Sequence, residues 1–579
     1  MSEEVKNEEV VVEVEKRNFF QKWFIDKPVS VWLHAKKHFW LYVTIVALVV
    51  ALYFFQQLSS YMGDWKKAIY LIAGVSAFTG VLWLWKIDAL GNALKHLKKN
   101  WYWYFLAVIA IASALYIFEG AWIHGILMKL REYTFVVFFL PVMFYSFKWL
   151  VKKETKTLVG KIVVVSLGFI VSGSIAAYLY LGGQQYIAQS MKYTEINASI
   201  QWLDKLPETI QERVYPRDVY RSTMDQLYGD NNIFSDPDLV FSPNKDLEFV
   251  ATATPLKKAL KFLEGEIDTV IHLPADSANL DNMVKENVKF AVGEGLVWSR
   301  DVYNYTIKSL YLNYPNVFPT NVQVIKNDKD KEVMVVSLAQ WKGWFFPTPE
   351  FYGVAIIEQG EISWPRRAIA GNAKIIKKDE LKNYKWLLKQ NLNSEVSTRY
   401  AAESLKFENG FWAPAPFVHD DDIAVTDMEG DRNELPLVMA MKFKDEVKLY
   451  DFYELRPWKK TSGNARIYLW IPSDGQGVIY GYRPKGVISM NELTTKVSGS
   501  VDYNTEQKYA YVEPRPFFKK GLPEIFIVSR VLKRKDGSFD PSGVKTYLIN
   551  ARGGQSKVIE VPTYQKEKWE SMAREAFGK

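Results

Sequence analysis

The chain has 579 residues, with 73 Lys and Arg, 65 Asp and Glu, and no cysteine. The lack of cysteine excludes disulfides, thiolate nucleophiles and cysteine-ligated zinc or iron–sulfur centres. Residues 1–182 hold twenty basic and twelve acidic residues, which accounts for the whole net charge of +8. The remainder is therefore neutral. We expect no nucleic-acid partner, because nucleic-acid binding needs a basic surface that displaces counterions from phosphate.

The first 38 residues combine an acidic tail with a basic, aromatic segment. The chain begins MSEEVKNEEVVVEVEKR, whereas a cleavable signal peptide begins with basic residues and ends in small ones. We predict that residues 1–38 form a disordered cytoplasmic tail and a juxtamembrane segment that lies along anionic lipid.

Five apolar stretches follow, and a helix needs about 20 mostly apolar residues to cross a hydrocarbon core. They predict an all-α polytopic membrane domain over residues 39–182, with the lipid bilayer as a partner. The fourth stretch contains Lys148, and a buried or re-entrant helix is the alternative there. The predicted spans are Phe39–Phe55, Ala68–Trp85, Trp101–Phe118, Tyr133–Val151 and Ile162–Leu181.

The loops between these stretches predict an orientation. Lys and Arg are numerous before the first stretch and in the second and fourth connections, and fewer in the first and third. This alternation places the N-terminus in the cytoplasm. Five crossings then make a multi-pass cell-membrane protein with everything after Gly182 outside the cytoplasm. If one of the five predicted spans does not cross the membrane, the residues after Gly182 stay in the cytoplasm.

After Gly182, short β-rich runs alternate with turn residues, which is typical of antiparallel hairpins. Hairpins are predicted at residues 322–338, 354–364, 465–482 and 546–561, and a further one begins with the strand and turn at residues 526–538. Helices are predicted at residues 216–228, 302–312, 378–390, 394–406 and 564–577. The expected fold is a C-terminal α+β soluble domain with two subdomains, residues 183–418 and 437–579, joined by an acidic linker at 419–436.

The acidic linker contains the strongest cation-binding pattern. Hard cations prefer several carboxylate oxygens on flexible backbone, so calcium is the only cofactor that the sequence suggests. The spacing of a calcium-binding helix–loop–helix is absent, and a solvated linker is the alternative. The predicted ligands are Asp420, Asp422, Asp427 and Glu429.

Residues 341–353 form the densest aromatic segment outside the apolar stretches. Exposed rings stack on sugars or anchor a partner protein, whereas rings beneath a turn form core. The residues predicted to bind are Trp341, Trp344, Phe345, Phe346, Glu350, Phe351 and Tyr352. Arg366 and Arg367 suit a carboxylate or phosphate ligand, with surface ion pairing as the alternative.

Catalytic patterns are scarce: the phosphate-binding loop, the His-Glu-x-x-His motif and the Gly-x-Ser-x-Gly elbow are all missing. We therefore expect an integral membrane protein that displays a non-catalytic domain for binding or envelope assembly. Its expected partner is a protein or an envelope polymer; the oligomeric state is left open. One alternative is a transport component with a polar path at Glu119 and His124. The other is a membrane-tethered carbohydrate enzyme that uses Glu350.

Overall fold

The computed structural model describes residue Asn100, helix α6 (Trp101–Glu132) and most of the chain after residue 183. The chain divides into two compact units, Met1–Ile109 and Ala110–Lys579, and the fold below belongs to the second. The described residues are 100–132, 184–228, 232–242, 246–255, 266–276, 282–294, 296, 298–310, 314, 316–343, 346–409, 423–426, 436–443, 446–457, 463–501, 509–533, 539–552 and 557–578.

The predicted fold class is wrong for the part of the chain that can be described, which is mostly β-sheet. None of the helices in that part combines the length and apolar composition needed to cross a membrane, which also overturns the transmembrane assignment there. The third predicted span is the first part of α6, which continues through Glu119 to Glu132. Its second half contacts protein: His124 is buried, and Arg131 donates to the Gly343 carbonyl. The other four predicted spans lie outside the described residues.

The largest sheet has seven strands in the order β1-β16-β15-β14-β13-β2, with β12 also pairing with β14. Its pairs are antiparallel except for β1 and β16. Strands from before and after residues 419–436 therefore share one sheet, and the division into two subdomains stays a prediction. The strands are β1 (Ile200–Trp202), β2 (Glu208–Thr209), β12 (Ile423–Val425), β13 (Leu437–Phe443), β14 (Glu446–Pro457), β15 (Ile467–Pro472) and β16 (Ile479–Tyr482).

Three smaller sheets are antiparallel throughout. The first has the order β3-β5-β6-β7, with β4 on β5; the second has the order β11-β10-β9-β8, and the third β17-β18-β19-β20. Their strands are β3 (Asn232–Phe234), β4 (Asp238–Phe241), β5 (Leu247–Pro255), β6 (Ile267–Pro274), β7 (Val284–Phe290), β8 (Val317–Lys326), β9 (Glu332–Lys342), β10 (Thr348–Ile357), β11 (Lys374–Lys377), β17 (Tyr509–Pro516), β18 (Ile525–Lys533), β19 (Phe539–Asn550) and β20 (Val558–Val561).

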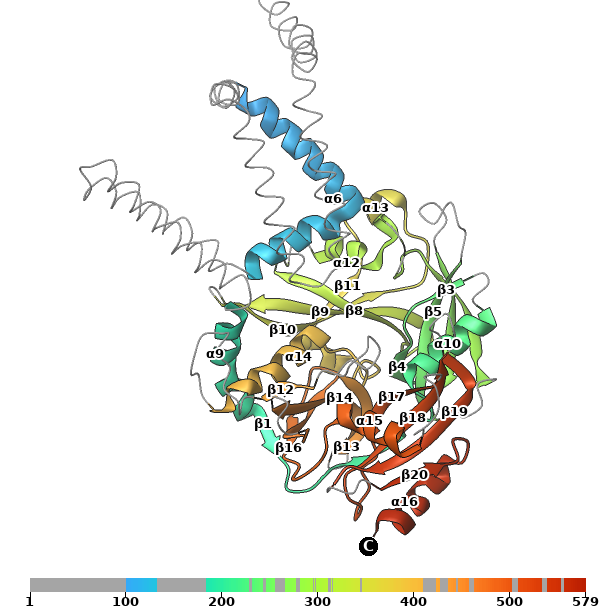
Figure 1. Ribbon diagram of the computed structural model, residues 1–579. Coiled ribbons are helices and arrows are strands. Elements are labelled where there is room, and N and C mark those ends of the chain that lie inside the picture. Colours follow the sequence, from blue (N-terminus) through green and yellow to red (C-terminus); the bar gives the residue numbers. More distant parts are fainter. Residues whose placement is uncertain are drawn as a thin grey trace, which may run out of the picture. The chain divides into compact units, whose positions relative to one another are not determined.

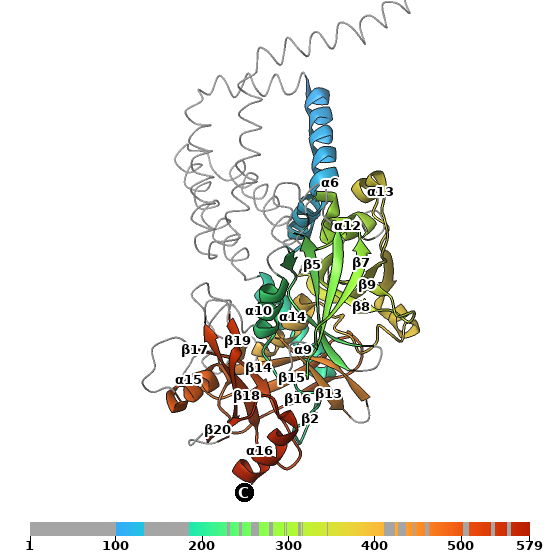
Figure 2. The same ribbon diagram turned by 90° about the vertical axis from the view of Figure 1, so that its right-hand side faces the viewer.

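Helices cover these sheets (Figure 1). Helix α14 packs against α9, while α15 lies against β17 and α16 against β20, as Figure 2 also shows. The helices are α9 (Gln184–Ser199), α10 (Arg217–Tyr228), α12 (Val302–Leu310), α13 (Trp364–Ile369), α14 (Glu395–Ser404), α15 (Met490–Val501) and α16 (Trp569–Phe577). Short 3-10 turns are η4 (Trp298–Arg300), η5 (Lys378–Asn383), η6 (Leu405–Asn409) and η7 (Lys566–Lys568).

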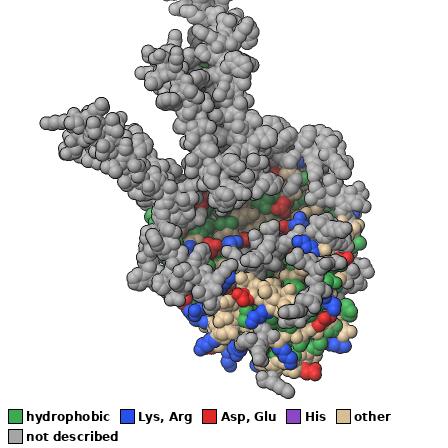
Figure 3. All heavy atoms as spheres, viewed as in Figure 1, with side chains coloured by type: hydrophobic (Ala, Val, Ile, Leu, Met, Phe, Trp, Pro, Cys, Tyr) green, Lys and Arg blue, Asp and Glu red, His purple; other side chains and the backbone are tan. Residues whose placement is uncertain are grey.

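Aromatic residues make up much of the core of the seven-stranded sheet. Phe452, Tyr468 and Trp470 are fully buried on β14 and β15, and they pack with Phe518 and Phe526 from the β17–β20 region. A second core, built mainly from β-branched residues, lies on the β8–β11 sheet. At the surface, basic and acidic side chains are interspersed over the face seen in Figure 3.

Candidate metal centre

The register of the five-stranded sheet gathers three polar side chains on one face. His272 on β6 pairs with Val250 on β5 and with Val284 on β7. Residues two positions along a strand share a face, so Glu248 and Glu286 lie diagonally beside His272. β6 is buried along nearly its whole length, with apolar residues on both sides of the histidine.

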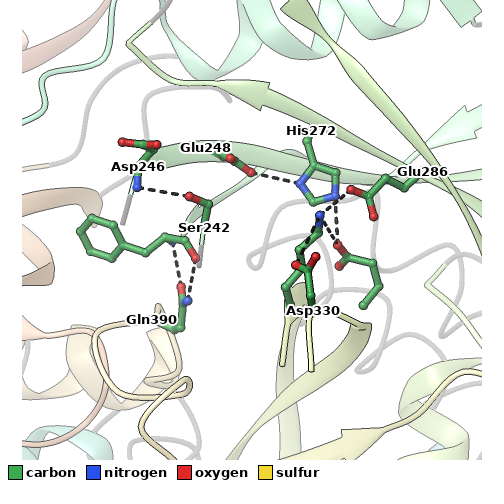
Figure 4. A network of polar contacts seen from close by, with 10 residues as sticks. Ser242, Asp246, Glu248, His272, Glu286, Asp330 and Gln390 are labelled. Atoms are coloured by element: carbon green, nitrogen blue, oxygen red, sulfur yellow. Dashed lines mark hydrogen bonds and ion pairs between the residues drawn. The ribbon is translucent and has the colours of Figure 1, made fainter. Parts of the chain in front are cut away.

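A hairpin of a second sheet supplies the remaining members of the cluster. Lys326 at the end of β8 pairs directly with Glu332 at the start of β9. Glu332 Oε1 lies 3.1 Å from His272 Nε2, and Lys326 Nζ lies 2.5 Å from Glu286 Oε1, so the cluster lies where the two sheets meet. Figure 4 shows His272 with Glu248 and Glu286 on either side of it. His272 is 6% exposed and Glu332 is 2% exposed. Neither side chain therefore has full access to solvent.

His272 lies between two carboxylates. Its Nδ1 is 3.2 Å from Glu248 Oε2, and its Nε2 is 3.1 Å from Glu332 Oε1. Burial lowers the pKa of His272, but the hydrogen bond to Glu248 and the negative charges of Glu248 and Glu332 outweigh that effect and raise the pKa to about 9. The imidazole is therefore a cation at neutral pH in this arrangement.

Several buried atoms of the cluster have no hydrogen bond. His272 Nε2 and both Glu332 carboxylate oxygens lack a hydrogen-bond partner of acceptable geometry, even though Nε2 and Oε1 are at ion-pair distance. A buried carboxylate without hydrogen bonds is costly, and such an atom in a folded protein calls for an explanation such as a bound water or ion.

The donor set suits a metal ion. One ligand atom each from His272, Glu286 and Glu332 lies within 4.8 Å of the others. One nitrogen and two carboxylate oxygens match zinc, manganese or iron(II) better than calcium, which prefers oxygen alone. A hydrogen bond from His272 Nδ1–H to Glu248 would leave His272 Nε2 free to bind the metal. Carboxylates commonly hold metal-binding histidines in this way.

Lys326 competes with a metal for the same carboxylates. Its Nζ is 2.5 Å from Glu286 Oε1 and 3.9 Å from Glu332 Oε1. Its ammonium therefore supplies a positive charge that a metal would otherwise bring. The side chain is 20% exposed, and its flexible stem can carry the ammonium toward water. Metal binding here requires Lys326 to move and His272 to lose its proton.

The structure places the predicted aromatic residues partly in the interior. Trp341 stacks on Phe318 with ring centroids 5.6 Å apart, and Phe351 belongs to the β8–β11 core. Tyr352 is half-buried and contacts Tyr314, and Phe346 is also half-buried. Trp344 and Phe345 lie outside the described residues. Binding by this segment stays a prediction.

Glu350 is held by two lysines rather than set in an acid–base site. Its carboxylate lies 2.5 Å from Lys192 Nζ and 3.1 Å from Lys342 Nζ. Burial alone would raise the pKa of Glu350, but the two lysines lower it below its ordinary value. A general acid needs the opposite shift, so this geometry does not favour the carbohydrate-enzyme alternative.

Of the remaining predicted residues, the structure describes the two arginines. On α13, Arg366 is exposed, while Arg367 is buried and donates to the Ile362 carbonyl at 3.3 Å. The predicted calcium ligands, Asp420, Asp422, Asp427 and Glu429, lie outside the described residues.

A second carboxylate pair lines a cavity too small for a sugar. Asp238 and Glu294 line a space of about 10 Å³, which holds about one water. Burial raises the pKa of both carboxyls, and Tyr303 donates to Glu294 at 3.1 Å. The cavity leaves no room for a glycoside substrate.

The sequence analysis missed His272 as a site residue. It is one of two histidines after residue 182, and it stands alone in a β-rich apolar run, Ile267–Pro274. The isolation of His272 in this apolar run is the only local signal that it is a site residue. Glu332 is 60 positions away, and nothing in the spacing links the two residues.

Comparison with known proteins adds little. No protein-family model matches the sequence, and no curated protein matches it. One solved structure with a weak likeness is the NanB sialidase from Streptococcus pneumoniae in complex with 2-[(3-chlorobenzyl)ammonio]ethanesulfonate. The alignment has 10% identity and a TM-score of 0.16, and it covers 62% of this chain and 64% of the sialidase chain. The match spans less than two thirds of that protein, and a TM-score this low carries no argument about fold or function.

Proposed function

We propose that the β-rich region is a non-catalytic binding or assembly module whose sheets are joined by a divalent metal at His272, Glu286 and Glu332. One observation carries the proposal: a buried imidazole nitrogen and a buried carboxylate face each other without hydrogen bonds where two sheets meet. A protein or an envelope polymer remains the proposed partner of the module.

A structural role for the metal fits the burial of two of its three ligands. A catalytic metal keeps an open position that a substrate can reach, whereas a structural metal has its coordination closed by protein. His272 and Glu332 are almost wholly buried between strands. A metal there would tie β6 and β7 to β9 and stabilise the folded state by mass action.

Metal titration of the purified full chain tests the proposal. After treatment with a chelator, Zn²⁺, Mn²⁺ and Co²⁺ are titrated by calorimetry, and the thermal midpoint is measured with and without metal. We expect saturable binding of one ion per chain and a higher midpoint. Co²⁺ should give visible absorption bands that report nitrogen and oxygen ligands.

One variant and one matched control locate the site. Glu332→Gln removes a ligand charge with little change in shape, so binding should weaken by about 10- to 100-fold or more. Glu361→Gln is the matched control, because Glu361 pairs with Lys289 at an exposed position. If the Glu332→Gln protein bound metal as tightly as the Glu361→Gln protein, the proposed centre would be wrong.

A further inference from the structure

A second buried cluster, far from the histidine in sequence, carries an excess of positive charge. Glu513 on β17 accepts from two guanidinium groups: Arg213 Nη2 is 2.9 Å from Oε1, and Arg515 Nη1 is 3.4 Å from Oε2. All three residues are less than a tenth exposed. One carboxylate thus faces two buried cations.

The neighbouring carboxylate does not remove this excess. Glu212 has its own cation, because Lys519 Nζ lies 2.5 Å from its Oε1. Lys566, which is close to Glu212 and Lys519, is in turn near Asp276. If Glu513, Glu212 and Asp276 each neutralise one cation, one guanidinium charge remains uncompensated. A buried uncompensated charge is strongly unfavourable.

A small cavity adjoins the two arginines. It has a volume of about 30 Å³, while a single water needs about 10–15 Å³ on the same measure. Arg213 and Arg515 line it, together with Glu212, Gln211, Thr209 and eight apolar residues that include Leu239, Leu437 and Ile527. The space therefore suits one or two waters or a single monatomic anion, and it is too small for a bulky organic anion.

Arg515 has a donor left over at this cavity. Its Nη2 donates to Ser529 Oγ at 3.0 Å and to the Val214 carbonyl at 3.4 Å. Its Nε is buried and has no hydrogen-bond partner in the described residues. An unmet N–H on a buried cation favours an anionic acceptor over an empty space.

We propose that the cavity beside Arg213 and Arg515 binds a halide ion, with chloride as the natural ligand. The ion accepts the Arg515 Nε–H, balances the leftover guanidinium charge and contacts the apolar lining. Burial lowers the pKa of Arg515 to about 10, which still leaves the guanidinium charged at neutral pH. The proposal is independent of the metal centre, because no residue belongs to both sites.

Salt-specific stabilisation of the purified full chain tests the halide site. Thermal midpoints are compared in sodium chloride, sodium bromide and sodium gluconate at equal ionic strength. We expect a saturable rise with chloride and bromide that gluconate does not produce, because gluconate cannot enter the cavity. Equal midpoints in the three salts at every concentration would overturn the proposal.

Variants and bromide scattering make the test specific. Arg515→Met removes the charge and should weaken halide binding about tenfold or more. Arg367→Met is the control, because Arg367 is buried but does not line this cavity. If Arg515→Met fails to fold, crystals of the unaltered chain grown in bromide decide the matter. An anomalous peak beside Arg515 Nε supports the site, and its absence at saturating bromide refutes it.

Discussion

Lys192 of helix α9 donates to Glu350 of strand β10 across 2.5 Å, although 158 positions separate them in the sequence. This bond ties the first described helix after residue 183 to an interior strand of the β8–β11 sheet. It also accounts for the charged state of the carboxylate that the sequence analysis considered for catalysis.

The first prediction concerns the strength of this pair. In a double-mutant cycle of Lys192→Met and Glu350→Gln, we expect a coupling free energy of about 1 kcal/mol, because both side chains are largely shielded from water. Urea unfolding at pH 7 measures it. The same cycle with Lys342→Met should give a smaller value, because the Lys342 side chain is 64% exposed. If the losses of stability in Lys192→Met and Glu350→Gln were strictly additive, the predicted coupling between the two residues would be wrong.

The coupling should also depend on pH with a defined sign. The pKa of Glu350 is lower in the folded state than its ordinary value. Its contribution to stability is therefore complete above the unfolded pKa and is lost as the pH falls through the folded pKa. We expect the coupling to persist at pH 7 and to vanish in strong acid.

The second prediction concerns a buried acid in the seven-stranded sheet. Burial raises the pKa of Asp451 on β14 to about 7, although Ser473 Oγ donates to its carboxylate at 2.7 Å. An acid with a raised folded pKa stabilises the protein below its unfolded pKa, and this contribution is lost as the pH rises through 7. Asp451→Asn should therefore raise the free energy of unfolding at pH 8 by roughly 2–4 kcal/mol.

The same variant provides its own control at low pH. At pH 5 the native Asp451 is already protonated, so the substitution should change stability by much less than at pH 8. Denaturant unfolding at both values is the measurement. An equal effect at pH 5 and pH 8 would show that Asp451 does not titrate in this range.

The third prediction concerns Gly353, which lies at the bulge of β10. Its φ of +150° is unfavourable for residues with a side chain, and a Cβ there would collide with the carbonyl oxygen of Ile376 on β11. Gly353→Ala should destabilise the fold by more than about 2 kcal/mol. Gly360 has a similar φ of +136° but open space around its Cβ position, so Gly360→Ala isolates the backbone cost. Equal losses for the two variants would exclude the collision.

The fourth prediction concerns Lys326 as the competitor for the proposed metal. Lys326→Met removes the ammonium from Glu286 and Glu332 while keeping the stem, so metal affinity should rise by about tenfold. Calorimetric titration of the chelator-treated chain measures the change. Lys289→Met is the control, since Lys289 pairs with Glu361 at an exposed position. A lower affinity for Lys326→Met would mean that the lysine supports the site instead of blocking it.

Local sequence patterns predicted several elements correctly. The run at residues 322–338 forms the hairpin of β8 and β9, because β-branched runs flank a short polar turn. The helix that begins after Pro216 is α10, since proline favours a first helical turn. Helices α12, α14 and α16 also lie within their predicted ranges.

Other predictions failed where pairing is not local. The hairpin expected at residues 354–364 does not form, because β10 pairs with β9 and with β11, and α13 intervenes before β11. Residues 378–390 form only the short turn η5 instead of a long helix. Helices α9 and α15 were missed; α9 has little apolar periodicity of its own.

The sequence alone determined the chemistry that is excluded, the neutral charge of the chain after residue 182, and the hairpins whose turns are local. Only the tertiary structure decided that Arg131 at the end of α6 contacts Gly343, and that His272, Glu286 and Glu332 meet. The physical reason is that turn and strand preferences act over a few residues. A buried cluster instead depends on sheet register and on packing between sheets, which no spacing along the chain encodes.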